Sequence, residues 1–396
     1  MSKPKIRFKG YEEDWEQRKL GDVLEEFSNK STVEDEYTVL SSTNTGMEFR
    51  DGRVSGTSNL GYKIIEIDDL VLSPQNLWLG NININNLEKG LVSPSYKTFK
   101  LRNIDKEFFR PQLRTKKMLE LYKQASVQGA SVVRRNLDMD LFEQIELNIP
   151  MIEEQAKIGE YFFNLDYLIT LHQRKCEETK KLKKYMLQKM FPQNGKRVPE
   201  IRFVGFTDDW EQRKLGDMGS TFTGLSGKTK EDFGHGDAQF ITYMNVFSNP
   251  VANLEMTEAV EIDAKQNRVK KGDVFFTTSS ETPEEVGMSC VMPENKDNIY
   301  LNSFCFGYRP TEKFDLDYLA YVLRADSFRK EMKFLAQGIS RYNISKNKVM
   351  EVSIPIPNLE EQTMVGRYFS TLDHLITLHQ RQTDFYKKPN FYFISS

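Results

Sequence analysis

The sequence predicts an α+β protein in which two domains of mixed strands and helices are joined by two long antiparallel helices of the coiled-coil type. Three observations support this fold class: a leader segment occurs twice, an amphipathic helix follows each copy, and the inserts between leader and helix share no comparable identity. The chain of 396 residues is therefore a tandem duplication with an internal pseudo-two-fold repeat.

The duplication divides the chain into four segments. Residues 1–150 form the first domain with its leader, and 151–196 form the central long helix. Residues 197–357 form the second domain with its leader, and 358–396 form the last helix. Two or three domains are the ordinary expectation for a chain of this length.

The leader is repeated closely. Residues 4–22 and 199–217 are identical at 14 of 19 positions and share the unbroken run DWEQRKLGD. Trp15 and Trp210 are predicted to pack against the domain that follows each leader. Stacking of these two indole rings on nucleic-acid bases is the alternative.

The long helices are predicted from apolar residues at alternating steps of four and three, which is the pattern of a coiled-coil seam. In 153–191 the seam passes through Ile158, Phe162, Leu165, Ile169, His172 and Cys176. Residues 360–381 repeat 153–174 at 15 of 22 positions, so the chain supplies its own partner helix. A helix of about 39 residues is roughly 58 Å long.

Local signals mark both helix starts and the end of the last helix. Pro150 and Pro357 precede the starts, and the glutamates that follow suit the positive end of the helix dipole. After Arg381 the second copy departs from the first, and Pro389 predicts that the helix stops there. We therefore expect a shortened last helix and weakened assembly.

Each insert is predicted to place strands first and a basic helix late. β-Branched and aromatic residues between turn residues mark the strands. The predicted strands lie in 36–44, 62–74 and 95–101 of the first insert and in 239–246, 273–280 and 303–309 of the second. The predicted helices lie in 109–124 and 316–335, and polar, basic loops follow in 129–142 and 338–350.

The charge is unevenly distributed along the chain. A net charge of -2 argues against a protein that coats nucleic acid indiscriminately. Residues 100–135 nevertheless hold ten Lys or Arg against three acids, and residues 324–348 hold seven against two. Two such runs at corresponding places favour contacts with phosphate, although a solvated face is the alternative for each run.

No motif for catalysis, metal binding or membrane insertion is found. Glycine-rich cofactor turns, nuclease patterns and catalytic Cys/His pairs are absent, and no cofactor or metal is expected on this chain. The run GLSGKT at 224–229 resembles the end of a phosphate-binding loop, but Phe222 stands where that motif needs glycine. Three cysteines without paired spacing, and no apolar run of membrane length, predict a cytoplasmic protein.

A binding function therefore remains. Two different domains, each held between a repeated leader and a repeated helix, are suited to reading two short sequences on one DNA duplex. Basic side chains would contact phosphates, and polar side chains in loops would read base edges. The candidate DNA-binding residues are Gln75, Asn76, Trp78, Arg114, Lys116, Lys117, Arg134, Arg135, Asn136, Ser340, Arg341, Asn343, Lys346 and Lys348. Ordinary solvation is the alternative for each of them.

Two other classes of function stay open at this stage. A self-contained DNA methyltransferase or nuclease would need cofactor and base-binding motifs that the sequence lacks. A coiled-coil scaffold that binds only proteins would leave the inserts without DNA contacts, and its affinity would depend little on salt.

The arrangement resembles the specificity subunit of type I restriction-modification systems, and the pattern looks like those of staphylococci. The resemblance is carried by WEQRKLGD, a diverged insert, IPxxEEQ and a basic helix, the first three given twice. It implies two target recognition domains, each reading one half of a bipartite DNA site, with the spacer set by the long helices. It also implies a subunit that is not itself an enzyme.

The resemblance further implies partners for the long helices. Two modification subunits would supply S-adenosylmethionine, and restriction subunits would use ATP and Mg; the family is not associated with membranes. The residues expected to contact the modification subunits are Glu154, Gln155, Phe162, Arg174, Glu361, Gln362, Phe369 and Arg381.

Overall fold

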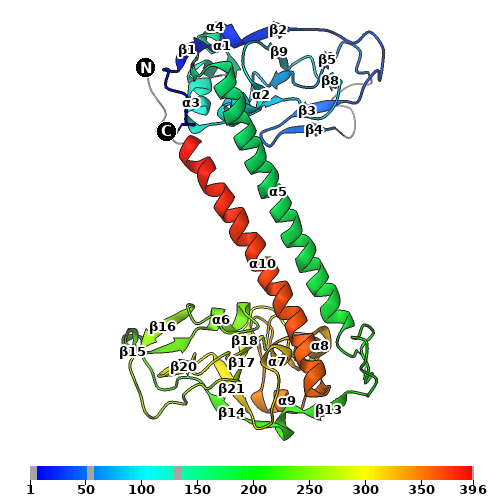
Figure 1. Ribbon diagram of the computed structural model, residues 1–396, viewed down its shortest axis with the longest axis vertical. Coiled ribbons are helices and arrows are strands. Elements are labelled where there is room, and N and C mark those ends of the chain that lie inside the picture. Colours follow the sequence, from blue (N-terminus) through cyan, green and yellow to red (C-terminus); the bar gives the residue numbers. More distant parts are fainter. Residues whose placement is uncertain (1–6, 51–57, 129–134, 194, 395–396) are drawn as a thin grey trace. The chain divides into compact units, whose positions relative to one another are not determined.

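The computed structural model describes residues 7–50, 58–128, 135–193 and 195–394. The chain divides into two compact units, Met1–Gln173 with Arg381–Ser396 and Arg174–Gln380. Each unit holds one domain of mixed strands and helices and one segment of each long helix (Figure 1). The long helices are α5 (Ile152–Lys189) and α10 (Leu359–Ile394), so the predicted fold class is confirmed.

The first domain is built on an antiparallel sheet in the order β2-β9-β6-β7. Its strands are β2 (Leu24–Phe27), β9 (Lys97–Leu101), β6 (Leu70–Leu72) and β7 (Ile82–Ile84). Two further antiparallel pairs are β3 (Leu40–Ser42) with β4 (Met47–Phe49) and β5 (Lys63–Ile65) with β8 (Gly90–Val92). Helices α2 (Lys106–Gln112) and α3 (Lys116–Gln124) follow β9, and α4 (Met139–Glu143) comes later.

The second domain has a main sheet of the same form, in the order β14-β21-β17-β19. Its strands are β14 (Gly219–Thr223), β21 (Cys305–Pro310), β17 (Val274–Thr277) and β19 (Ser289–Val291). A three-stranded sheet joins β16 (Thr257–Val260), β15 (Phe233–Ile241) and β20 (Ile299–Leu301), with β15 and β20 parallel. Helices α7 (Leu316–Val322), α8 (Asp326–Leu335) and α9 (Lys346–Met350) match α2, α3 and α4 in order.

One predicted strand of the second insert ends earlier than expected. Residues 239–246 were predicted as a strand, but β15 ends at Ile241 and α6 (Tyr243–Ser248) begins two residues later. Thr242 caps this helix, because its Oγ1 accepts a hydrogen bond of 3.2 Å from the backbone N–H of Asn245. The cap outweighs the strand preference of the aromatic residues.

A short antiparallel ladder closes each domain where its insert begins and ends. In the first domain β1 (Glu16–Lys19) pairs with β12 (Glu146–Ile149), and in the second β13 (Glu211–Lys214) pairs with β23 (Ser353–Ile356). The repeated EQRK of the leader thus forms a strand, which sequence reasoning missed because its residues have little strand preference. The leader turns directly into α1 (Leu20–Val23) in the first domain and the 3₁₀ turn Leu215–Asp217 in the second.

The two long helices pair in antiparallel fashion within each unit. In Arg174–Gln380, Lys183 Nζ lies 2.5 Å from an oxygen of Asp373, and Cys176 Sγ lies 4.0 Å from the carbonyl oxygen of Ile376. In the other unit, the rings of His172 and Tyr386 stack at 5.7 Å. Residue numbers rise along α5 as they fall along α10, as the predicted pair requires.

Much of the predicted seam is buried in the core of a domain. Ile158, Phe162 and Leu165 are buried in the core of the first domain. Val365, Phe369 and Leu372 are likewise buried in the core of the second. Each helix start is therefore part of a domain core.

The prediction that Pro389 ends the last helix is wrong, since α10 runs on to Ile394. Proline lacks an N–H and crowds the carbonyl four residues earlier, which disfavours a helix by about 3 kcal/mol but does not forbid it. The helices span 38 and 36 residues, so the expected shortening is also wrong.

The repeated residues at each helix start bind that helix to its leader and its domain. The guanidinium of Arg7 donates to both oxygens of Glu154 at 2.7 and 2.8 Å, and Arg202 donates to Glu361 at 2.7 and 2.9 Å. Both glutamate side chains are buried, and Glu361 also accepts a hydrogen bond of 3.0 Å from the indole of Trp210. The helix dipole accounts for acids in the first turn, and the structure adds an arginine partner for Glu154 and for Glu361.

The glutamine and glycine of the repeat complete this attachment. Gln155 Oε1 accepts a hydrogen bond of 2.9 Å from the N–H of Asp105, and Gln362 accepts one of 3.1 Å from Asp315. A β-carbon at Gly159 would lie 2.8 Å from the nitrogen of Phe108, so only glycine lets α2 approach α5 this closely. The motif EEQxxxG is therefore a docking site for the chain's own domain.

We predict that Arg202→Met costs about 3 to 5 kcal/mol of unfolding free energy, because it leaves the carboxylate of Glu361 buried without its partner. The matched control is Arg213→Met, whose partner Glu312 is 40% exposed and whose loss should cost under about 1 kcal/mol. Urea unfolding of the whole chain measures both variants. Equal losses would show that the buried pair does not anchor the helix.

Candidate nucleic-acid interface

In the first domain, two segments far apart in sequence meet beside the main sheet. The turn between β6 and β7 carries Gln75, Asn76 and a 3₁₀ turn (Leu77–Leu79). The hairpin strands β10 (Ser126–Gln128) and β11 (Arg135–Leu137) follow α3, and the N–H of Arg135 donates to the carbonyl of Gln75 at 3.4 Å. Gln75 and Asn136 are exposed, so the structure brings these predicted residues together.

The second domain builds the same junction from other residues. The turn between β17 and β19 carries β18 (Ser279–Ser280), which pairs with β22 (Tyr342–Asn343). The predicted residues of this loop and of α9 are all exposed: Ser340, Arg341, Asn343, Lys346 and Lys348. We call each junction of turn and following loop a reading surface: turn 73–81 with 135–137, and turn 278–288 with 340–343.

Trp78 is half-buried in the turn between β6 and β7. Its ring packs against the core of the first domain, and its Nε1 is buried without a hydrogen-bond partner among the described residues. Its position in a polar turn suggested an exposed side chain, but the 3₁₀ turn directs the ring inward. Its assignment to DNA binding stays a prediction.

Arg114 also acts inside the first domain. Its guanidinium donates to the carbonyls of Ile82 at 3.3 Å and Asn44 at 3.1 Å and to the side chain of Asn83. Burial lowers the pKa of Arg114, as expected for a cation drawn out of water. Arg114 thus ties the turn after β3 to β7, and its assignment to DNA binding stays a prediction.

The remaining candidates of the first domain differ in their surroundings. Lys116 and Lys117 are exposed in the first turn of α3. Asn76 precedes the 3₁₀ turn and is half-buried, and Arg135 donates to the carbonyl of Ser126 at 2.8 Å. Arg134 lies outside the described residues.

Two arginines of the second basic run are likewise internal. Arg329 donates to the carbonyls of Gly287, Val286 and Glu284 at 2.6 to 2.8 Å, and Arg324 binds four carbonyls that include those of Ser289 and Val246. Burial lowers the pKa of each guanidinium to about 10. Arg329 thus fixes part of the turn 278–288, and fewer cations reach the surface than the sequence count implies.

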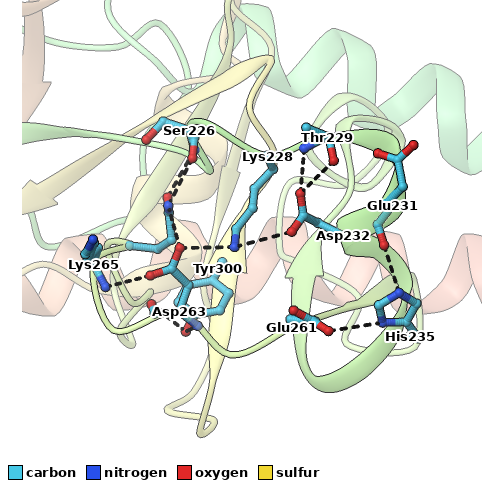
Figure 2. A network of polar contacts seen from close by, with 11 residues as sticks. Ser226, Lys228, Thr229, Glu231, Asp232, His235, Glu261, Asp263, Lys265 and Tyr300 are labelled. Carbon is cyan, nitrogen blue, oxygen red and sulfur yellow. Dashed lines mark hydrogen bonds and ion pairs between the residues drawn. The ribbon is translucent and has the colours of Figure 1, made fainter.

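The run GLSGKT does not form a phosphate-binding loop. Lys228 forms an ion pair of 3.0 Å with Asp263 and lies 3.9 Å from Asp232 (Figure 2). Thr229 precedes a short 3₁₀ turn (Lys230–Asp232) and not the long helix that a phosphate loop opens. The lysine therefore joins two surface loops, as the loop interpretation of this run expected.

The carboxylate of Asp263 is the centre of this network (Figure 2). It accepts hydrogen bonds from the N–H of Lys265 at 2.9 Å and from Gln266 at 3.1 Å, in addition to its pair with Lys228. These donors, the backbone N–H first, lower the pKa of Asp263 to about 2. The network holds the loop that carries GLSGKT.

Most residues predicted to bind modification subunits are corrected by the structure. Six of them are buried in contacts within the chain: Glu154, Gln155, Phe162, Glu361, Gln362 and Phe369. Only Arg174 and Arg381 of this set are exposed. The identity of the repeats reflects internal docking, which sequence alone does not distinguish from partner contact.

An exposed pair of aromatic residues was missed. Phe163 and Tyr167 lie four residues apart on α5 and are 56% and 61% exposed. Their equivalents in the second copy are Ser370 and His374, so this apolar face is not repeated. The signal was a pair of large rings at helical spacing outside the seam.

Across the ranges that the structure describes, no helix is both long and apolar enough to span a membrane. Within the same ranges, no group of three or more His, Cys, Asp or Glu side chains is arranged to hold a metal ion.

Comparisons with known proteins agree with the repeated architecture. A family model described as the type I restriction modification DNA specificity domain matches residues 12–181 and 207–384. In Methanocaldococcus jannaschii, the type I restriction enzyme MjaVIII specificity subunit is 24% identical over 395 residues, covering 94% of this chain and 89% of that protein. The putative MjaX specificity subunit of the same organism is 23% identical over 410 residues, covering 94% and 90%.

One solved structure also has a similar fold. The S subunit of the type I restriction-modification system from M. genitalium has a TM-score of 0.54 at 12% identity, covering 99% of this chain and 98% of that one. At this identity the match concerns the fold alone.

We predict that Lys228→Met raises the pKa of Asp263, because the ion pair favours the charged carboxylate. Ionised Asp263 stabilises the folded loop at pH values above its ordinary pKa, and this stabilisation is lost as the pH falls toward 2. A carboxyl NMR titration measures the change. Lys230→Met, two residues along the loop, is the control, and an equal rise in that variant would contradict the assigned pair.

A second prediction concerns the exposed lysines of α9. Changing Lys346 and Lys348 to Ala should reduce the slope of log affinity for DNA against log salt by up to about 2, because each phosphate contact releases about one counterion. Binding titrations at several salt concentrations give the slope. The control changes Lys270 and Lys271, which precede β17, whereas the turn 278–288 of the reading surface follows β17. The proposed interface is wrong if both pairs of substitutions reduce the slope equally.

Proposed function

Because the chain belongs to the family of type I restriction-modification DNA specificity subunits, we propose that each of its two domains reads one half of a bipartite DNA sequence. Its role in such a complex is the recognition of DNA sequence and not catalysis. Binding of the chain to double-stranded DNA through its two reading surfaces supplies the sequence preference of the complex.

The observation that carries this proposal is that two inserts without comparable sequence identity have the same topology. Both domains use the same order of four antiparallel strands, and both join the turn between two of those strands to the loop that follows a basic helix. The exposed residues of the two turns differ, Gln75 in one and Glu281 in the other, whereas Asn136 and Asn343 occupy equivalent positions of the repeat. Different side chains on equivalent surfaces support different half-sites.

The long helices are proposed to set the spacer between the half-sites and to bind two modification subunits. The firm attachment of each helix start to its own domain supports a fixed spacing. Arg174, Arg381, Phe163 and Tyr167 are exposed on these helices and are the candidates for partner contact. S-adenosylmethionine would be bound by the modification subunits, and ATP and Mg by the restriction subunits, in the cytoplasm.

The test is to express the chain with matching modification subunits and to map methyladenine across DNA of known sequence. We expect a bipartite motif with one fixed gap. Changing Arg341 and Asn343 together to Ala should relax or abolish one half of the motif, because both lie on the reading surface of one domain.

The matched variant changes Gln75 and Asn136 to Ala on the other reading surface and should affect the other half only. Equal loss of both halves in either variant would refute a separate role for each domain. Methylation without any bipartite motif would refute the proposed function as a whole.

A further inference from the structure

A recess beside the reading surface of the second domain is lined by three aromatic rings together with polar and charged side chains. It has a volume of about 350 Å³. Tyr243 and Phe247, both from α6, stack at a centroid distance of 6.0 Å on one side, and Phe304 contributes a ring that is 60% exposed. Arg341, already a candidate for DNA contact, lies at the same recess. All of these residues belong to one unit of the chain.

Hydrogen bonds join Tyr243 and Phe304 to the turn beside this recess. The carbonyl of Phe304 accepts hydrogen bonds from the N–H of Thr278 at 3.0 Å and from its hydroxyl at 2.8 Å. The hydroxyl of Tyr243 donates to the carbonyl of Ser279 at 2.7 Å. Thr278 and Ser279 belong to the turn of the reading surface, so the rings and that turn form one pre-organised unit.

The recess also holds two carboxylates, Glu281 and Glu285, beside a surface proposed to bind phosphates. The carboxylate of Glu285 accepts a hydrogen bond of 2.9 Å from Thr282, whereas that of Glu281 has no hydrogen bond or ion pair with any residue that the structure describes. A carboxylate near phosphate is repelled, and this cost is offset when it accepts a hydrogen bond from an amino group on a base edge.

Resting on the proposed function, we propose that this recess is a base-reading pocket for one position of the half-site read by the second domain. Glu281 accepts a hydrogen bond from the exocyclic amino group of an adenine or a cytosine in the major groove. Phe304 packs beside that edge and excludes water from the hydrogen bond, which strengthens it. Arg341 contacts the neighbouring edge or phosphate.

Two substitutions of Glu281 separate a reading role from a structural one. Glu281→Ala removes the acceptor and should lower methylation of sites with adenine or cytosine at that position by roughly tenfold. Glu281→Gln can accept or donate after its amide rotates, so it should admit thymine or guanine, whose keto oxygens need a donor. Loss of a structural contact would not exchange one class of base for another.

The experiment maps methyladenine with the complete modification complex on DNA that contains all base combinations at each position. Glu294→Gln, an exposed glutamate in the turn after β19, is the control, because it lies at the opposite end of that strand from the turn 278–288. It should leave both half-sites unchanged. Co-purification with the modification subunits and the thermal unfolding midpoint verify that each variant is folded.

The possible outcomes test the base-reading pocket and the proposed two-domain function separately. Broadened preference at one position of one half-site in Glu281→Gln supports the pocket. A bipartite motif that is unchanged in both Glu281 variants overturns the pocket and leaves the two-domain function standing. Equal effects on both half-sites also overturn the pocket, and absence of any bipartite motif in the parent complex overturns the proposed function first.

Discussion

The architecture depends on a buried arginine–carboxylate pair that occurs once in each half of the chain. Arg7 with Glu154 and Arg202 with Glu361 join a leader to the first turn of a long helix. A buried carboxylate is strongly unfavourable without its cation, so neither member can change alone. The glutamine and glycine that follow add a hydrogen bond and a close approach to the same helix start. Together they explain why this frame is repeated almost unchanged.

The frame leaves the inserts free to differ. Each insert begins and ends at one antiparallel ladder, so its two ends stay fixed whatever lies between them. The core of each insert is closed by the helix start, through Phe162 in one domain and Phe369 in the other. The exposed side chains of the reading surfaces lie outside the ladder and the helix start, which suits a protein whose halves carry different preferences.

The sequence predicts the parts of this fold that depend on local pattern or on internal repetition. The duplication, the long helices and the strands with β-branched residues could all be predicted from such patterns. What it misses depends on contacts between distant residues: the strand formed by EQRK, the inward ring of Trp78 and the partner of Glu154. Pro389 shows the limit of a local rule, since a cost of about 3 kcal/mol is tolerated within a long helix.

The basic runs show why charge counts alone do not locate a binding surface. Arginine presents several donors in a planar fork, so it can bind several carbonyls at once, and Arg114, Arg324 and Arg329 do this inside their domains. Lysines such as Lys346 stay exposed, where a single charge suits phosphate. Arg329 donates hydrogen bonds to the turn that carries Glu281. Arg114 donates one to β7, the strand that follows the turn with Gln75. The internal arginines thus make each reading surface rigid, and rigidity is what allows a few polar side chains to distinguish one base edge from another.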